Sequence, residues 1–268
     1  MTRDDTPAGN PAVPSLAELL DRYLRRRSEA HAAGLALPEA GGEVVPFEAA
    51  PALPVDPKLA WDEALAVLRH FRPDFALSSL RPPADWPAVV TGHEPEAALA
   101  FCLGNYPQMV RDLHPLWQAE DLAALRPAPR RPVAAPGLGT WAADAGRKGA
   151  YPHLLLVAAV QRLAGELDAA AEALRQGQKK SPAEWRDALA NEEAALAWHA
   201  GRADEAAALW RRQPDSVPVW FNRGMAALFL GRPAEARDLL GQAAAALPEE
   251  SAWHHLARLY LALAESRG

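Results

Sequence analysis

A short motif recurs three times in the C-terminal half of this 268-residue chain, and it constrains the fold more than any other feature. Residues 201–206 read GRADEA, residues 231–236 read GRPAEA, and residues 165–170 read GELDAA, a looser version. Each copy lies between two apolar segments with helical spacing, so the recurring unit is a helix, a tight turn and a second helix. Units of this kind, spaced 30–36 residues apart, bury a core only by stacking on their neighbours. The spacing therefore predicts an array of helical hairpins.

The third unit carries the fullest pattern. It has a large residue at Trp220, small residues at Gly224 and Ala227, the turn glycine Gly231 and a closing proline, Pro248. This pattern resembles the tetratricopeptide repeat (TPR), in which small residues let two antiparallel helices approach closely. The first unit is in register with it, the second has a truncated second helix, and a partial fourth unit would end the array as a cap helix. The resemblance covers residues 151–268.

The rest of the chain matches no family that we can name. Residues 1–14 are polar and predict a flexible tail, and residues 15–126 predict a helical region. Within that region, the segment around Gly104 is either a degenerate repeat or an ordinary helical hairpin. Residues 127–150 are rich in proline and glycine and predict a linker without a continuous element. The expected fold is thus all-α: a right-handed α-solenoid of TPR-like repeats after an irregular helical N-terminal region.

Three local signals outside the repeated motif give finer expectations. Asp56 and Pro57 are a typical helix start, and the helix should end near Phe71. Residues 88–90 read AVV and predict, weakly, a strand. Residues 181–184 read SPAE, the pattern of a capping box in which the serine side chain accepts a hydrogen bond from the start of a helix.

Composition excludes several classes of function. The formal net charge is −6 and neither half of the chain is basic, which argues against binding to nucleic acid or to an anionic membrane surface. The longest apolar run, residues 154–160, is too short to cross a bilayer. Cys102 is the one cysteine, so no internal disulfide forms, and the N-terminus is polar. These features predict a soluble cytoplasmic protein.

The TPR resemblance also implies candidate binding residues, because the first helices of such arrays line a concave groove that binds peptides. Reading by register, the groove residues are Arg162, Asn191, Phe221, Asn222, Met225, Phe229, His254 and Arg258. An asparagine there could bond a peptide backbone through its donor and its acceptor. The apolar stripe of Phe221, Met225 and Phe229 has two interpretations, a binding surface or core packing, and the sequence leaves both open.

No catalytic constellation, metal site or cofactor site is predicted. His254 and His255 are adjacent and therefore point apart on a helix, without a carboxylate or cysteine at ligand spacing. The expected function is a non-catalytic adaptor for a protein or peptide, with the oligomeric state left open. One alternative is an N-terminal enzyme or ligand-binding domain regulated by the array, with a pocket among Trp61, His70, Asp74, Trp86 and His114. Another is a structural protein that self-associates through the open end of the array.

Overall fold

The computed structural model describes the chain in segments, and all regular structure in them is helical. The described residues are 57–74, 81–91, 119, 121–122, 127–147 and 151–268. They all belong to the second of two compact units, Met1–Ala52 and Leu53–Gly268. The predicted linker, residues 127–150, falls inside this second unit. The predicted tail, the cap residue Asp56, the segment around Gly104 and the thiol of Cys102 lie outside the described residues.

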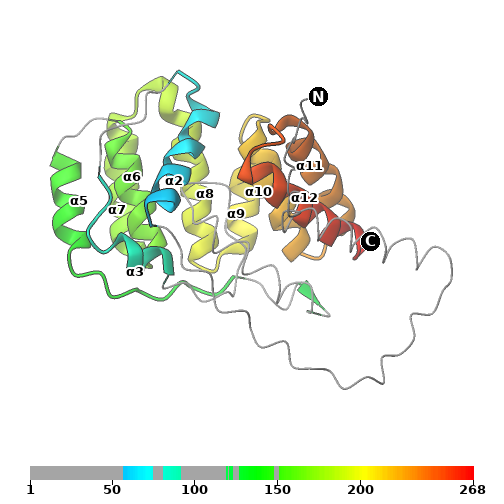
Figure 1. Ribbon diagram of the computed structural model, residues 1–268, viewed down its shortest axis with the longest axis horizontal. Helices are drawn as coiled ribbons and strands as arrows, with labels where there is room; N and C mark the ends of the chain where they lie inside the picture. Colours follow the sequence, from blue (N-terminus) through cyan, green and yellow to red (C-terminus); the bar gives the residue numbers. More distant parts are fainter. Residues whose placement is uncertain (1–56, 75–80, 92–118, 120, 123–126, 148–150) are drawn as a thin grey trace, which may run out of the picture. The chain divides into compact units, whose positions relative to one another are not determined.

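Helical hairpins make up the C-terminal part of this unit, as the repeated motif predicts (Figure 1). Their helices are α6 (His153–Leu163), α7 (Leu167–Lys180), α8 (Arg186–His199), α9 (Ala203–Arg211), α10 (Val217–Phe229) and α11 (Pro233–Ala246). They pair as α6 with α7, α8 with α9 and α10 with α11, and α12 (Ala252–Glu265) packs on α11. Helix α9 has 9 residues where α7 and α11 have 14, which confirms the predicted truncation of the second unit.

The glycine of each motif copy ends the first helix of its hairpin. Gly165, Gly201 and Gly231 have φ angles of 79°, 77° and 72°. A side chain in this left-handed region costs about 1–2 kcal/mol, and glycine avoids that cost. In each turn the residue after the glycine donates a backbone hydrogen bond of 2.9 Å to the carbonyl oxygen five residues earlier, for example from Glu166 to Gln161. The motif is therefore the sequence signature of a Schellman helix end.

Within the described residues, three further helices precede the hairpins: α2 (Pro57–Phe71), α3 (Trp86–Thr91) and α5 (Leu138–Arg147). The bounds of α2 confirm the helix predicted from Pro57 to Phe71. The weak prediction of a strand at 88–90 is wrong, because these residues lie in α3. Trp86 and Val89 of α3 are buried in the core, and this tertiary packing outweighs the strand preference of valine.

Helix α5 corrects the prediction that residues 127–150 hold no continuous element. Its buried residues Leu138, Ala142 and Ala145 belong to the same hydrophobic cluster as α6. Gly139 and Gly146 have open space where a side chain would begin, so they weaken the helix only by their low propensity. The predicted capping box at 181–184 is also wrong. Residues Ala183–Trp185 form a short 3-10 helix, η2, which no side chain caps, and Ser181 donates its hydroxyl to the carbonyl oxygen of Pro182 at 3.1 Å.

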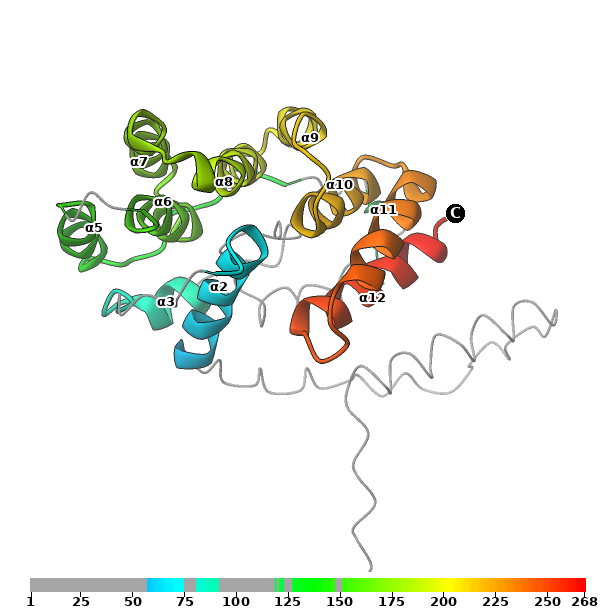
Figure 2. The same ribbon diagram turned by 90° about the horizontal axis from the view of Figure 1, so that it is seen from above.

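The first helices of the hairpins form a row, and its α6 and α8 members have helices on both sides (Figure 2). Helices α7, α9 and α11 lie on one side of α6, α8 and α10, and α2 and α3 lie on the other. Helix α2 contacts α8, and α3 contacts both α2 and α6. Helix α6 is accordingly buried along most of its length, which explains why most of its residues are apolar.

An extended segment, residues 127–135, runs across the ends of the first two hairpins; we call it the strap. The amide of Arg130 donates to the carbonyl oxygen of His199, and that of Val133 donates to Ala164, both at 2.8 Å. A Cβ atom on Gly165 would lie 2.6 Å from the carbonyl carbon of Arg131. The first two turns therefore need glycine for space as well as for φ. Among the described helices, none is both long and apolar enough to cross a membrane.

Candidate partner-binding site

Six of the eight groove residues expected from the sequence are buried. Their side chains are at most 1% exposed: Arg162, Asn191, Phe221, Asn222, Met225 and Phe229. His254 is partly exposed and Arg258 is exposed, and both lie on α12. In this structure only these two of the eight candidates offer a side chain to a partner.

The apolar stripe on α10 is core packing, the second of the two interpretations that the sequence left open. The ring of Phe221 meets Trp253 at 5.5 Å and Tyr260 at 6.0 Å, both edge to face. Phe229 meets Trp198 at 6.0 Å in the same geometry. These contacts join α10 to α12 on one side and to α8 on the other. The stripe holds the row of first helices together.

The two asparagines form a neutral polar network inside the array. Oδ1 of Asn191 accepts hydrogen bonds from Nδ2 of Asn222 at 2.7 Å and from Nε1 of Trp210 at 3.0 Å. The three residues come from α8, α10 and α9. A buried carbonyl oxygen that lacked these donors would be costly, so the network specifies how the second and third hairpins meet.

Arg162 belongs to a buried charged cluster. Its Nε and Nη2 donate to the two carboxylate oxygens of Glu192, the second at 3.3 Å, and its Nη1 lies 3.0 Å from Nδ1 of His199. Nη1 of Arg130 on the strap lies 3.4 Å from the same nitrogen. Because a guanidinium can only donate, Nδ1 of His199 is the acceptor and the proton of the neutral ring is on Nε2. The cluster links α6, α8 and the strap.

Burial and charge act together on this cluster. Burial, followed by the positive charges of Arg162 and Arg130, lowers the pKa of His199 well below its usual value. Burial raises the pKa of Glu192, while Arg162 acts in the opposite direction. Burial and the charge of Arg162 lower the pKa of Arg130 to about 9. The imidazole is thus neutral, and among the described residues the carboxylate of Glu192 is the acidic partner of the guanidinium group of Arg162.

Sequence reasoning named Arg162 but missed Glu192, His199 and Arg130 as its partners. The usable signal was a charged residue within an otherwise apolar first helix. Glu192 is 2% exposed, whereas its neighbour Glu193 is exposed, because adjacent residues on a helix point in different directions. Arg130 gave no signal, because it lies in a proline-rich segment.

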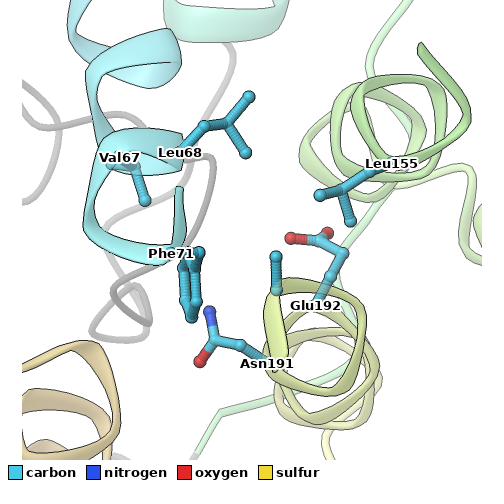
Figure 3. A pocket seen from close by; sticks show the side chains of 7 residues that line it. Val67, Leu68, Phe71, Leu155, Asn191 and Glu192 are labelled. Atoms are coloured by element: carbon cyan, nitrogen blue, oxygen red, sulfur yellow. The ribbon is translucent and has the colours of Figure 1, made fainter. Parts of the chain in front are cut away.

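A small hollow lies between α2 and the first two hairpins (Figure 3). Its lining residues are Val67, Leu68 and Phe71 from α2, Leu155 from α6, and Ala188, Asn191 and Glu192 from α8. Its interior volume is about 10 Å³, which is space for about one water molecule. Figure 3 shows Phe71 and Asn191 pointing toward each other on one side of it and Glu192 near Leu155 on the other.

Of the residues suggested for a pocket by the alternative of an N-terminal enzyme, the structure describes Trp61, His70, Asp74 and Trp86. The rings of Trp61 and Trp86 pack edge to face at 5.0 Å, and Trp141 joins them at 6.4 Å from Trp61. Asp74 pairs with Arg72 through bonds of 2.9 and 2.8 Å. Burial lowers the pKa of His70, and His114 lies outside the described residues.

The histidines of α12 do not form a metal site with their described neighbours. Nδ1 of His254 lies 3.0 Å from the carbonyl oxygen of Ala244, and the rings of His254 and His255 meet edge to face at 5.6 Å. Within the described ranges, no three histidine, cysteine or carboxylate side chains gather closely enough to hold a metal ion.

Comparison with protein-family models, with curated proteins and with solved structures gave no significant match.

Proposed function

We propose that this protein is a cytoplasmic, non-catalytic adaptor that binds a helical segment of another protein. In this proposal the hairpins form a right-handed TPR-like solenoid, and the row of first helices is its concave wall. The observation that carries the proposal is that an amphipathic helix, α2, lies against this wall from the side opposite α7, α9 and α11 (Figure 2). A surface that accommodates one amphipathic helix has the shape and chemistry to bind another.

The exposed end of the wall is the first place where a partner would make contact. Helix α12 continues the row of first helices beyond α10, and its apolar side packs on α10 and α11. On this helix Arg258 is exposed, and His254 and His255, one turn away, are partly exposed. We expect a partner to meet this cationic, aromatic edge and to bury Arg258 against a carboxylate or carbonyl oxygen.

A photo-crosslinking amino acid placed at position 258 tests this function in the full-length protein. The matched control is position 237 on α11, where the arginine is 52% exposed but lies on the side of the array away from the wall. The adaptor function predicts that one protein is labelled from position 258 and not from position 237. Equal labelling from both positions would mean that no surface is preferred.

The labelled protein, once purified, allows a quantitative measurement. We expect Arg258→Ala to weaken its binding by about 2 kcal/mol, roughly 30-fold in Kd by calorimetry, because a buried arginine anchor carries that much at an interface. Arg237→Ala should leave Kd unchanged. If the two variants bind the labelled protein with equal affinity, Arg258 is not part of the binding site.

A further inference from the structure

Helix α2 has the residue pattern of a ligand for the wall. Trp61, Leu65 and Leu68, at i, i+4 and i+7, are 5%, 3% and 1% exposed. Lys58 and Arg69, at the edge of this stripe, are exposed. This is the arrangement by which an amphipathic helix inserts its apolar stripe into a groove.

The apolar side of α2 is buried as far as Val67 and Leu68, which are each 1% exposed, and the last residue of the helix is less buried. Phe71 is only half-buried, and the hollow beneath it separates Val67 and Phe71 from Asn191 and Glu192 on α8. Space for about one water molecule lies here next to an amide and a carboxylate. The apolar side chain of Phe71 offers no donor to that carboxylate.

The end of α2 is held by an accessible contact. Nη1 of Arg72 lies 3.6 Å from a carboxylate oxygen of Glu184, which is 53% exposed, and the guanidinium lies over the ring of Trp185 at 5.4 Å. Asp74 binds the same guanidinium. Exposed ion pairs contribute little to stability, so this tether can open without disturbing the core.

We propose that α2 is a built-in occupant of the wall formed by α6 and α8, and that a partner helix replaces it. This inference rests on the proposed function. The partner helix carries large apolar residues at i, i+4 and i+7, like α2, and a hydrogen-bond donor such as arginine, lysine or glutamine at i+10, where α2 has Phe71. The donor reaches Glu192 across the hollow. Binding of the partner is therefore regulated by release of α2.

Synthetic peptides test this in the full-length protein. The probes are a fluorescein-labelled peptide of residues 57–72 and the same peptide with Phe71→Arg. Weakening α2 with Leu65→Ala and Leu68→Ala should make the protein bind the first peptide at least tenfold more tightly than the unaltered protein does. The Phe71→Arg peptide should bind several-fold more tightly still. The control protein, Lys58→Ala with Arg69→Ala, should bind both peptides like the unaltered chain.

Hydrogen exchange of the unaltered protein gives a second, independent readout. The amides of α2 should exchange faster than those of α6 and α8, through an opening smaller than global unfolding. If α2 exchanges only with the whole unit, or if the Leu65→Ala and Leu68→Ala protein loses the hairpin helicity, α2 is a fixed part of the core and the proposal is overturned. Peptide affinities that do not differ between altered and unaltered protein overturn it too.

The oligomeric state separates the remaining outcomes. If light scattering shows that the altered protein forms a concentration-dependent dimer, α2 of a second copy occupies the wall. That result would overturn the proposal that a helix of another protein binds there. Another outcome is that the protein with weakened α2 binds the peptides while the crosslinker at position 258 labels no protein. In that case the proposed adaptor function is wrong, but the proposal that α2 occupies the wall still holds.

Discussion

The first two hairpin turns and the third have the same motif and the same backbone conformation, but they have different surroundings. Gly165 and Gly201 lie under the strap, and Cβ atoms there would meet Arg131 and Pro129. A Cβ atom on Gly231 would have no neighbour within 4 Å. The covered turns are also where the strap places Arg130 against His199. The same local motif thus ends each first helix, but the strap covers the first two turns and not the third.

The same contrast holds for the polar residues of the array. Between the first two hairpins, a charged cluster is buried and tied to the strap. Between the second and third, the buried polar contact is the neutral pair of Asn191 and Asn222. At the third turn Arg232 pairs with Glu235, and both are 37% exposed. The second turn has an equivalent local pair, Arg202 with Glu205, so what distinguishes the first two turns is the long-range contacts that they make in addition.

Among the variants that test this contrast, Arg162→Met should have the largest effect on stability. It leaves Glu192 buried without its counter-charge, and the free energy of unfolding should fall by about 3–5 kcal/mol, as for other broken buried pairs. Arg232→Met, the matched change at the third turn, should cost no more than about 1 kcal/mol. Urea denaturation of both proteins gives the comparison. Adding Glu192→Leu to Arg162→Met should restore part of the loss, and equal losses in the two single variants would contradict the contrast.

The turns themselves can be compared by alanine substitution. Gly231→Ala should lower stability by about 1 kcal/mol, which is the cost of the left-handed backbone alone. Gly165→Ala should cost about 3 kcal/mol, because the methyl group also pushes the strap away from the turn. Thermal and urea unfolding measure both. If the two alanine variants are equally stable, the strap adds nothing to the first turn.

The smallest expected effect is a pH dependence due to His199. Its pKa is lowered in the folded protein, so as pH falls below about 6.5 the unfolded chain takes up a proton that the folded protein does not. Stability should therefore decrease with falling pH, by at most about 1.4 kcal/mol per pH unit, until the pH reaches the lowered pKa. The raised pKa of Glu192 acts in the opposite direction, because the folded protein then binds a proton more readily than the unfolded chain does.

A control variant isolates the histidine from the other titrating groups. Urea midpoints at pH 7.0, 6.0 and 5.5 should fall more steeply for the unaltered protein than for His199→Gln. Parallel pH profiles would show that the imidazole does not stay neutral in the cluster.

Much of the hairpin array could be predicted because its signals are local. The motif glycines, the helical spacing of apolar residues and the early end of α9 all act within one or two turns of chain. The predictions that failed did so where distant packing decided the outcome. Residues 88–90 are helical because α3 buries Trp86 and Val89, and α5 forms between prolines because its alanines pack on α6.

The candidate site was harder to predict for the same reason. Register alone placed Phe221, Met225 and Phe229 on the wall, but α12 and α8 bury them. Their apolar periodicity is the same whether a neighbouring helix or a partner covers them, so sequence reasoning had to leave the choice open.

The sequence by itself determined where the hairpins begin and turn, because glycine's tolerance of positive φ and the helical repeat of apolar residues are properties of short segments. Only the tertiary structure decided what covers the first helices. Arg162 meets Glu192 across 30 residues and Arg130 meets His199 across 69. Such contacts follow from the stacking of whole elements, and no periodic pattern in the chain records them.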